Sequence, residues 1–166
     1  TLLGLGLADV GGRKVWKRWV MILAAALLLV VRMLDLAIAV AATNVPPTAR
    51  GETTPADQGL AFTEVTFPTA DGVTLAGWYV PSRNGAAVVV LHGAGSTVSS
   101  ALDQAAVLAR AGYGVLLFDA RGHGESGGRA MDFGWFGDAD VAAALDYLAA
   151  RPDVDASRLA SLGLSM

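Results

Sequence analysis

The sequence predicts an α/β fold in which an antiparallel hairpin is followed by parallel strands joined by crossover helices, all preceded by an apolar helix. Two segments of alternating polarity, 64–69 and 73–80, lie on either side of an Asp-Gly turn. Two short continuous apolar segments follow, at 86–91 and 114–118, and a third, mostly apolar segment lies at 159–162. Segments with helical periodicity separate them, as in strand–helix–strand units.

The hairpin is the first element of the predicted sheet. Val65 and Phe67 alternate with polar neighbours in its first segment, and a second alternating segment follows Asp71-Gly72. Asp-Gly between two alternating segments is typical of a β-turn, and Pro81 ends the second strand.

The continuous apolar segments predict strands that are buried on both faces, as in a parallel sheet. Two helices are predicted between them, over Ser100–Ala111 and Asp138–Ala150. Ser100 together with Asp103 resembles a capping box, and Gly112 ends the first of these helices.

The apolar helix is predicted over residues 19–42, which is long enough to cross a membrane because about 20 residues suffice. Arg32 and Asp35 interrupt it, but they lie three positions apart and can pair. We expect an uncleaved anchor. A signal peptide cleaved near Ala37-Ile38-Ala39 and a buried core helix are the alternatives, and the basic flank disfavours the second.

The charges around this helix predict its orientation. Four Lys or Arg precede it and only Arg50 follows in the next stretch, which places the N-terminus in the cytoplasm and the domain outside a cell membrane that the chain crosses once. Cleavage would instead give a secreted protein. The expected organisation is a basic tail (1–18), the transmembrane helix or signal sequence (19–42), a Pro- and Gly-containing linker (43–59) and an α/β domain (60–166).

A candidate nucleophile follows the last predicted strand, in Gly163-Leu164-Ser165-Met166. These residues fill the first four positions of G-x-S-x-G, a sharp strand-to-helix turn that exposes a serine hydroxyl and needs a small residue such as Gly163. The alternative is an ordinary serine at a helix N-terminus. The preceding buried strand favours Ser165 as the candidate catalytic residue.

A second motif, His92-Gly93-Ala94-Gly95, follows the strand at 86–91. Small residues allow backbone N–H groups to approach a substrate carbonyl, and two converging N–H groups stabilise the oxyanion of a tetrahedral intermediate. This interpretation assigns the N–H groups of Ala94 and Met166 to an oxyanion hole. A plain Gly-rich loop is the alternative, and we expect His92 and Gly93 to support the loop.

The third motif, DARGHGES at 119–126, follows the strand at 114–118. We expect Asp119, Arg121 and His123 to shape this loop through hydrogen bonds. Its glycines also match the dinucleotide fingerprint G-x-G-x-x-G, but the match is separated from the strand and no apolar-periodic helix follows it. A nucleotide-binding oxidoreductase is therefore a disfavoured alternative.

Composition excludes several functions. The chain has no Cys, so it has no thiol nucleophile, disulfide or Cys-ligated metal site. Its formal net charge is −3 and it has no basic stripe with interleaved aromatic residues, so we expect no nucleic-acid partner. We expect no metal and no organic cofactor, and a small-molecule or acyl substrate.

In this order, the motifs HGAG, FDARGHGES and LGLSM resemble the serine-nucleophile branch of the α/β-hydrolase superfamily, in particular its serine aminopeptidase-like and dienelactone-hydrolase-like members. The resemblance covers residues 60–166. It implies that Ser165 is the nucleophile, that Ala94 and Met166 form the oxyanion hole and that no cofactor is used. In this superfamily the catalytic acid and histidine follow the serine, so both are expected beyond Met166.

The resemblance implies a serine hydrolase that acts on an ester, thioester or amide through an acyl-serine intermediate. The chain would then hold the N-terminal half of the fold, truncated after the nucleophile, and we expect it to be inactive by itself. A non-catalytic binding protein on the same fold is the alternative, because a fold does not fix a function.

Overall fold

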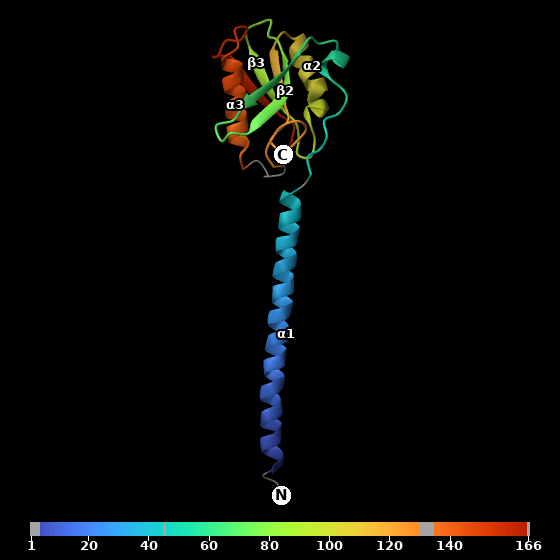
Figure 1. Ribbon diagram of the computed structural model, residues 1–166, viewed down its shortest axis with the longest axis vertical. Coiled ribbons are helices and arrows are strands. Elements are labelled where there is room, and N and C mark those ends of the chain that lie inside the picture. The colour runs from blue at the N-terminus through green and yellow to red at the C-terminus, as the bar shows by residue number, and fades with distance from the viewer. Residues whose placement is uncertain (1–3, 45, 130–134, 166) are drawn as a thin grey trace. The chain divides into compact units, whose positions relative to one another are not determined.

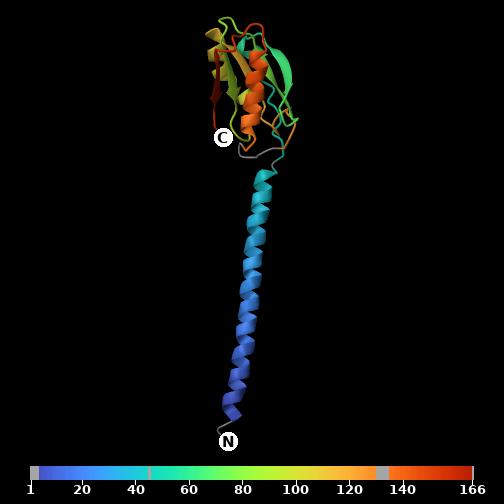
Figure 2. The ribbon, with the colours of Figure 1, turned by 90° about the vertical axis from the view of Figure 1, so that its left-hand side faces the viewer.

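The computed structural model describes residues 4–44, 46–129 and 135–165. It contains two compact units, residues 1–42 and 43–166, and the first consists of helix α1 (Gly4–Thr43). The second is an α/β unit (Figures 1 and 2). Its elements are, in chain order, η1 (Pro55–Gln58), β1 (Thr63–Pro68), β2 (Thr74–Val80), β3 (Ala87–Leu91), η2 (Val98–Ala101), α2 (Leu102–Arg110), β4 (Gly114–Phe118), α3 (Gly137–Ala149) and β5 (Leu159–Gly163).

Helix α1 is apolar along most of its length, and its described side chains are exposed. Its segment Lys14–Thr43 is long and apolar enough to cross a membrane, and a signal sequence near an N-terminus meets the same criterion. Arg32 and Asp35 form the expected ion pair, at 3.8 Å. The helix begins at Gly4, so the basic segment that was predicted to be a tail is helical. It ends before Pro46-Pro47, which cannot continue a helix.

The strands form one mixed sheet in the order β1-β2-β4-β3-β5. β1 and β2 form the predicted antiparallel hairpin, with Phe67 opposite Leu75, and β2 also pairs antiparallel with β4. β3 pairs in parallel with β4 on one side and with β5 on the other. The segments that follow β3, β4 and β5 therefore start at the same end of the sheet.

One helix covers each face of this sheet (Figures 1 and 2). Val88, Val90 and Leu117 pack on the face that α2 covers, whereas Val89 and Leu116 pack on the face that α3 covers. Successive strand residues point to opposite faces, and both faces are buried, so these strands are continuously apolar. Burying each such side chain contributes about 1.5–3 kcal/mol.

The start of α2 differs from the sequence prediction. Ser100 and Asp103 form no capping box, because α2 begins at Leu102 after the short 3₁₀ turn η2, in which the Ser100 hydroxyl donates to the carbonyl of Thr97 at 2.9 Å. The predicted end is confirmed. Gly112 follows the C-cap residue Ala111 and has a φ of 96°, a conformation that favours glycine.

The segment 43–59, predicted to be a linker, belongs to the same compact unit as the sheet. The hydroxyl of Ser99 donates to the carbonyls of Gly51 and Thr53 at 3.2 and 3.1 Å. Farther along, the Asp57 carboxylate accepts the backbone N–H of Thr54 at 2.8 Å, at the start of η1. The segment lacks periodicity because it is held by single polar contacts rather than by a helical or strand pattern.

Candidate functional site

Ser165 lies just beyond the end of β5, the edge strand beside β3. The N–H of Leu164 donates to the carbonyl of Leu91 at 3.1 Å, which extends the β3–β5 pairing to the residue before the serine. Ser165 is exposed. A Cβ atom added at Gly93 would lie 3.1 Å from the Cβ of Ser165, so the loop after β3 passes directly beside the serine.

The loop after β3 turns sharply at Ala94 and Gly95. The N–H of Ser96 donates to the carbonyl of Gly93 at 3.2 Å, and Gly95 has a φ of 71°. Ala94 is exposed, and within the described part of the chain its N–H donates to no other group. Met166, the second candidate oxyanion donor, lies outside the described residues.

His92 is buried at the start of this loop. Its Nε2 accepts the N–H of Ala120 at 3.0 Å, so Nδ1 carries the proton and donates to the carbonyl of Gly93 at 2.8 Å. Burial lowers the pKa of His92 and favours this neutral form. The ring therefore connects the loop after β3 with the loop after β4.

His123 makes the reciprocal connection from the loop after β4. Its Nε2 accepts the N–H of Gly95 at 3.2 Å, and its Nδ1 donates to the carbonyl of Arg121 at 3.1 Å. Its ring lies beside that of His92, with 5.2 Å between the ring centroids. Both nitrogens of each ring bond to backbone groups, so neither histidine offers a lone pair for general-base chemistry in this arrangement.

Asp119 follows β4 and is completely buried. Its Oδ1 accepts the N–H of Val98 at 2.9 Å, and its Oδ2 accepts the N–H of Glu125 at 3.1 Å. Arg50 supplies the opposite charge through Nε and Nη2, at 2.8 and 2.6 Å from Oδ2. Ser126 donates to the Asp119 carbonyl at 2.5 Å. A buried carboxylate needs such partners, and this one ties three segments together.

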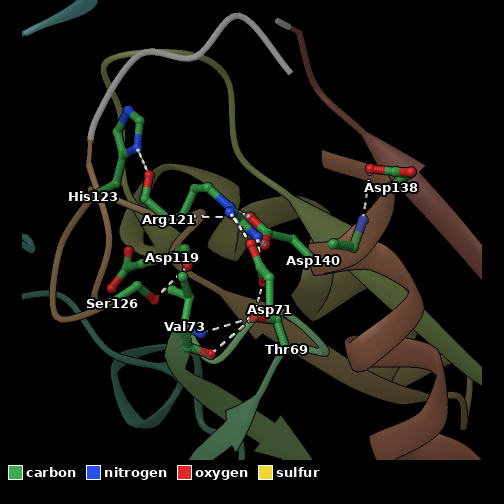
Figure 3. A network of polar contacts seen from close by, with 10 residues as sticks. Thr69, Asp71, Val73, Asp119, Arg121, His123, Ser126, Asp138 and Asp140 are labelled. Atoms are coloured by element: carbon green, nitrogen blue, oxygen red, sulfur yellow. Dashed lines mark hydrogen bonds and ion pairs between the residues drawn. The ribbon is translucent and has the colours of Figure 1, made fainter. Parts of the chain in front are cut away.

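Arg121 forms a second network (Figure 3). Its guanidinium donates to Asp140 from Nη2 at 2.6 Å and to Asp71 from Nη1 at 2.8 Å, and it lies over the ring of Phe136. The bonds from Arg121, helped by one from Thr69, lower the pKa of Asp71 to about 2. The bonds to Asp140 in turn raise the pKa of Arg121. The network joins the β1–β2 turn to the first turn of α3.

The glycines after β4 serve the turn itself. Gly122 donates its N–H to the carbonyl of Gly127 at 2.8 Å, which closes the loop, and the two described residues that come next, 128 and 129, are not helical. Gly124 has a φ of 50°, and a Cβ atom there would lie 2.0 Å from Asp119 Oδ2. This geometry explains the glycines without a dinucleotide. Among the described residues, no cluster of three or more His, Asp or Glu side chains suits a metal ion.

The requirement for a small residue at Gly163 stays a prediction. Among the described residues, a Cβ atom at Gly163 would have no neighbour within 4 Å. Sequence reasoning missed Arg50, Asp71 and Asp140, which the structure places around the loop after β4. Their contacts with this loop were not visible in the sequence, because their partners lie 19 to 69 positions away.

A mixed sheet of this order, with a serine on the turn after β5 beside a Gly-rich loop after β3, defines the class of α/β-hydrolases. The model of the family described as serine aminopeptidase, S33, matches residues 82–166, which is just over half of the chain. The chain belongs to this family, and it holds the N-terminal part of the fold.

The relatives include proteins of different descriptions. An uncharacterized protein of Mycobacterium tuberculosis is 39% identical over 106 residues, 62% of this chain and 37% of that protein. The thiohydrolase aneE of Aspergillus aculeatus is 42% identical over 69 residues, 40% of this chain and 22% of that protein. The solved structure of the Pyrococcus furiosus esterase Pf2001 matches with a TM-score of 0.69 and 31% identity, over 75% of this chain and 47% of that one. The chain thus spans less than half the length of each of these relatives.

Proposed function

We propose that Ser165 is the nucleophile of a hydrolase that cleaves an ester, thioester or amide. The serine oxygen bonds to the substrate carbonyl carbon, and its proton passes through a base to the departing alcohol, thiol or amine. Water then cleaves the acyl-serine and releases the acid. The N–H groups of Ala94 and Met166 stabilise the oxyanion of each tetrahedral intermediate, where the loss of one donor costs about 10²–10³ in kcat.

The observation that supports this proposal best is the contact between Gly93 and Ser165. Two motifs that are more than 70 positions apart in the sequence lie so close together that a Cβ atom added at Gly93 would be 3.1 Å from the Cβ of Ser165. The exposed Ala94, whose N–H has no acceptor among the described residues, directly follows Gly93. An oxyanion donor has to be free in this way before the substrate binds.

The base that activates Ser165 is proposed to lie outside these 166 residues. The chain has two histidines, His92 and His123, and both nitrogens of each ring are hydrogen-bonded to backbone groups. Loss of the base leaves only the catalysis that the oxyanion hole and binding provide. We therefore expect the chain by itself to be inactive.

The relatives support acyl substrates. One of them is named a thiohydrolase and a structural neighbour is named an esterase, which are hydrolases of acyl–sulfur and acyl–oxygen bonds. For this chain we propose the class that both share, a carbonyl carbon with a leaving group. Neither relative decides between oxygen, sulfur and nitrogen.

We propose that α1 anchors the protein in a membrane, with the N-terminus in the cytoplasm. The basic residues before its apolar part, and its segment Lys14–Thr43, support this orientation. A reporter enzyme fused after residue 60 tests the topology, because the proposed orientation predicts that its activity is found only outside the cytoplasm. Activity restricted to the cytoplasm would contradict the orientation, and release of a shorter protein would indicate a cleaved signal.

The direct test of the hydrolase is covalent labelling with a fluorophosphonate probe, in the longest natural form of the protein that carries this chain. We expect the wild type to be labelled and Ser165→Ala to be unlabelled. Ser161→Ala, at another exposed serine nearby on β5, is the matched control and should label normally. A folded wild type that resists the probe would contradict the proposal and favour a non-catalytic binding protein.

A further inference from the structure

The segment around Thr48 packs against both loops of the proposed active site. The carbonyl of Thr48 accepts the N–H of Gly124 at 2.9 Å, and its hydroxyl donates to the carbonyl of Gly95 at 3.1 Å. Gly95 is the neighbour of Ala94, the proposed oxyanion donor. Thr48 therefore joins the loop after β3 to the loop after β4 and contacts the first of them one residue from the proposed donor.

Arg50, two residues later, is clamped between these loops and the core. Only 9% of its side chain is exposed, and its guanidinium carbon lies 5.0 Å from the centre of the Trp78 ring. Besides its two bonds to Asp119, it donates from Nη1 to Glu125 at 2.8 Å. The whole side chain is thus held in one place by a ring face and two carboxylates.

The bond to Asp119 connects Arg50 to the loop after β3, which contains Ala94. Asp119 is completely buried, and its Oδ1 holds the N–H of Val98, the residue that ends the loop after β3 and begins η2. A buried carboxylate that loses its cation moves toward other polar partners or water. This movement weakens the bond to Val98, so Arg50 stabilises the end of the loop through Asp119.

We infer that Thr48 and Arg50 are positioning residues for the proposed oxyanion hole, an inference that rests on the proposed function. Thr48 fixes the loop after β3 at Gly95, and Arg50 fixes the end of the same loop at Val98. The N–H of Ala94 lies in this loop, whose first residues are held by the two histidines, and therefore keeps a constant direction. Neither residue touches the reacting atoms. Because the oxyanion develops only in the transition state, their loss lowers kcat more than it raises KM.

The test compares Arg50→Gln and Thr48→Val with the wild type, in the longest natural form of the protein, by kcat and KM for a p-nitrophenyl ester. We expect kcat to fall by roughly ten- to a hundredfold in Arg50→Gln, since a misplacement of about 1 Å costs about 10². Thr48→Val should lose activity in the same way, and Thr48→Ser, which keeps the hydroxyl, should restore it. Arg110→Gln is the matched control. Arg110 bonds to Gln58, and that contact touches neither loop.

Equal kcat values in Arg50→Gln and Arg110→Gln, or in Thr48→Val and Thr48→Ser, would overturn the inference. If Arg50→Gln does not fold, the two Thr48 variants decide, because they differ only at a partly buried side chain. Amide hydrogen exchange gives a readout independent of activity, and should be faster at Val98 in Arg50→Gln alone. An inactive wild type would contradict the proposed function, whereas normal kcat in the variants of an active wild type contradicts only the positioning role.

Discussion

Gly93→Ala places a methyl group against Ser165 and tests the contact on which the proposed site depends. The new Cβ would lie 3.1 Å from the Cβ of Ser165, whereas carbon atoms pack best at about 3.5–4.0 Å. The loop and the serine must therefore separate by about 0.4–0.9 Å. Since misplacement of about 1 Å costs about 10² in rate, we expect labelling of Ser165 to slow by roughly ten- to a hundredfold.

The assay is the second-order rate of fluorophosphonate labelling, measured together with the free energy of unfolding in urea. Overpacking costs about 1–3 kcal/mol in a closed core and less here, because Ser165 is exposed. Gly137→Ala, at the start of α3, is the matched control, since its methyl group meets no described atom within 4 Å. A labelling rate for Gly93→Ala equal to that of Gly137→Ala would show that the loop and the serine do not meet as described.

Three further predictions concern the polar contacts. Asp140→Asn should lower the free energy of unfolding in urea by about 3 kcal/mol, because it leaves a buried guanidinium without its main partner. Asp138→Asn, at an exposed position of the same helix turn, should change this free energy by less than about 1 kcal/mol. Because burial lowers the pKa of His92, the stability that its neutral ring contributes is complete above the ordinary pKa of 6.5 and falls as the pH drops below that value toward the lower pKa of the folded state. The free energy of unfolding in urea should therefore decrease less steeply from pH 7 to pH 5 in His92→Asn than in the wild type, and an equally steep decrease would contradict this. Tyr79→Phe removes a 2.7 Å bond to Asp153 and should lower the free energy of unfolding by about 1–2 kcal/mol. An absorbance titration of the wild type should find the pKa of Tyr79 raised to about 12 by burial and by Asp153. A Tyr79 pKa near 10 would contradict the buried contact.

The central strands were predictable because β3 and β4 are buried on both faces. The apolar segments ending at Leu91, Phe118 and Leu162 are each a strand within one residue of the predicted bounds. The prediction that the last of these strands is also buried was wrong, because β5 lies at the edge of the sheet and is largely exposed. The Asp71-Gly72 signal located the hairpin for the same local reason. The strand order was not predicted, since local patterns do not determine that β3 lies between β4 and β5.

The support of the candidate site was less predictable, because it depends on single polar side chains with distant partners. Arg50 appeared to be an ordinary charge in an irregular segment, yet it is bonded to Asp119, 69 positions later. Ser100 and Asp103 had the spacing of a capping box, but a 3₁₀ turn displaced the helix start. Spacing within a motif records local geometry, whereas these contacts arise only after the sheet has brought the loops together.

If Ser165 forms the acyl-enzyme, that species can be trapped. The longest natural form of the protein is mixed with p-nitrophenyl acetate, quenched in acid within the first turnover, digested and analysed by mass spectrometry. We expect an acetyl group on the peptide that contains Ser165, and none in Ser165→Ala. An acetyl group on another residue, or turnover without any acyl-enzyme, would contradict this expectation.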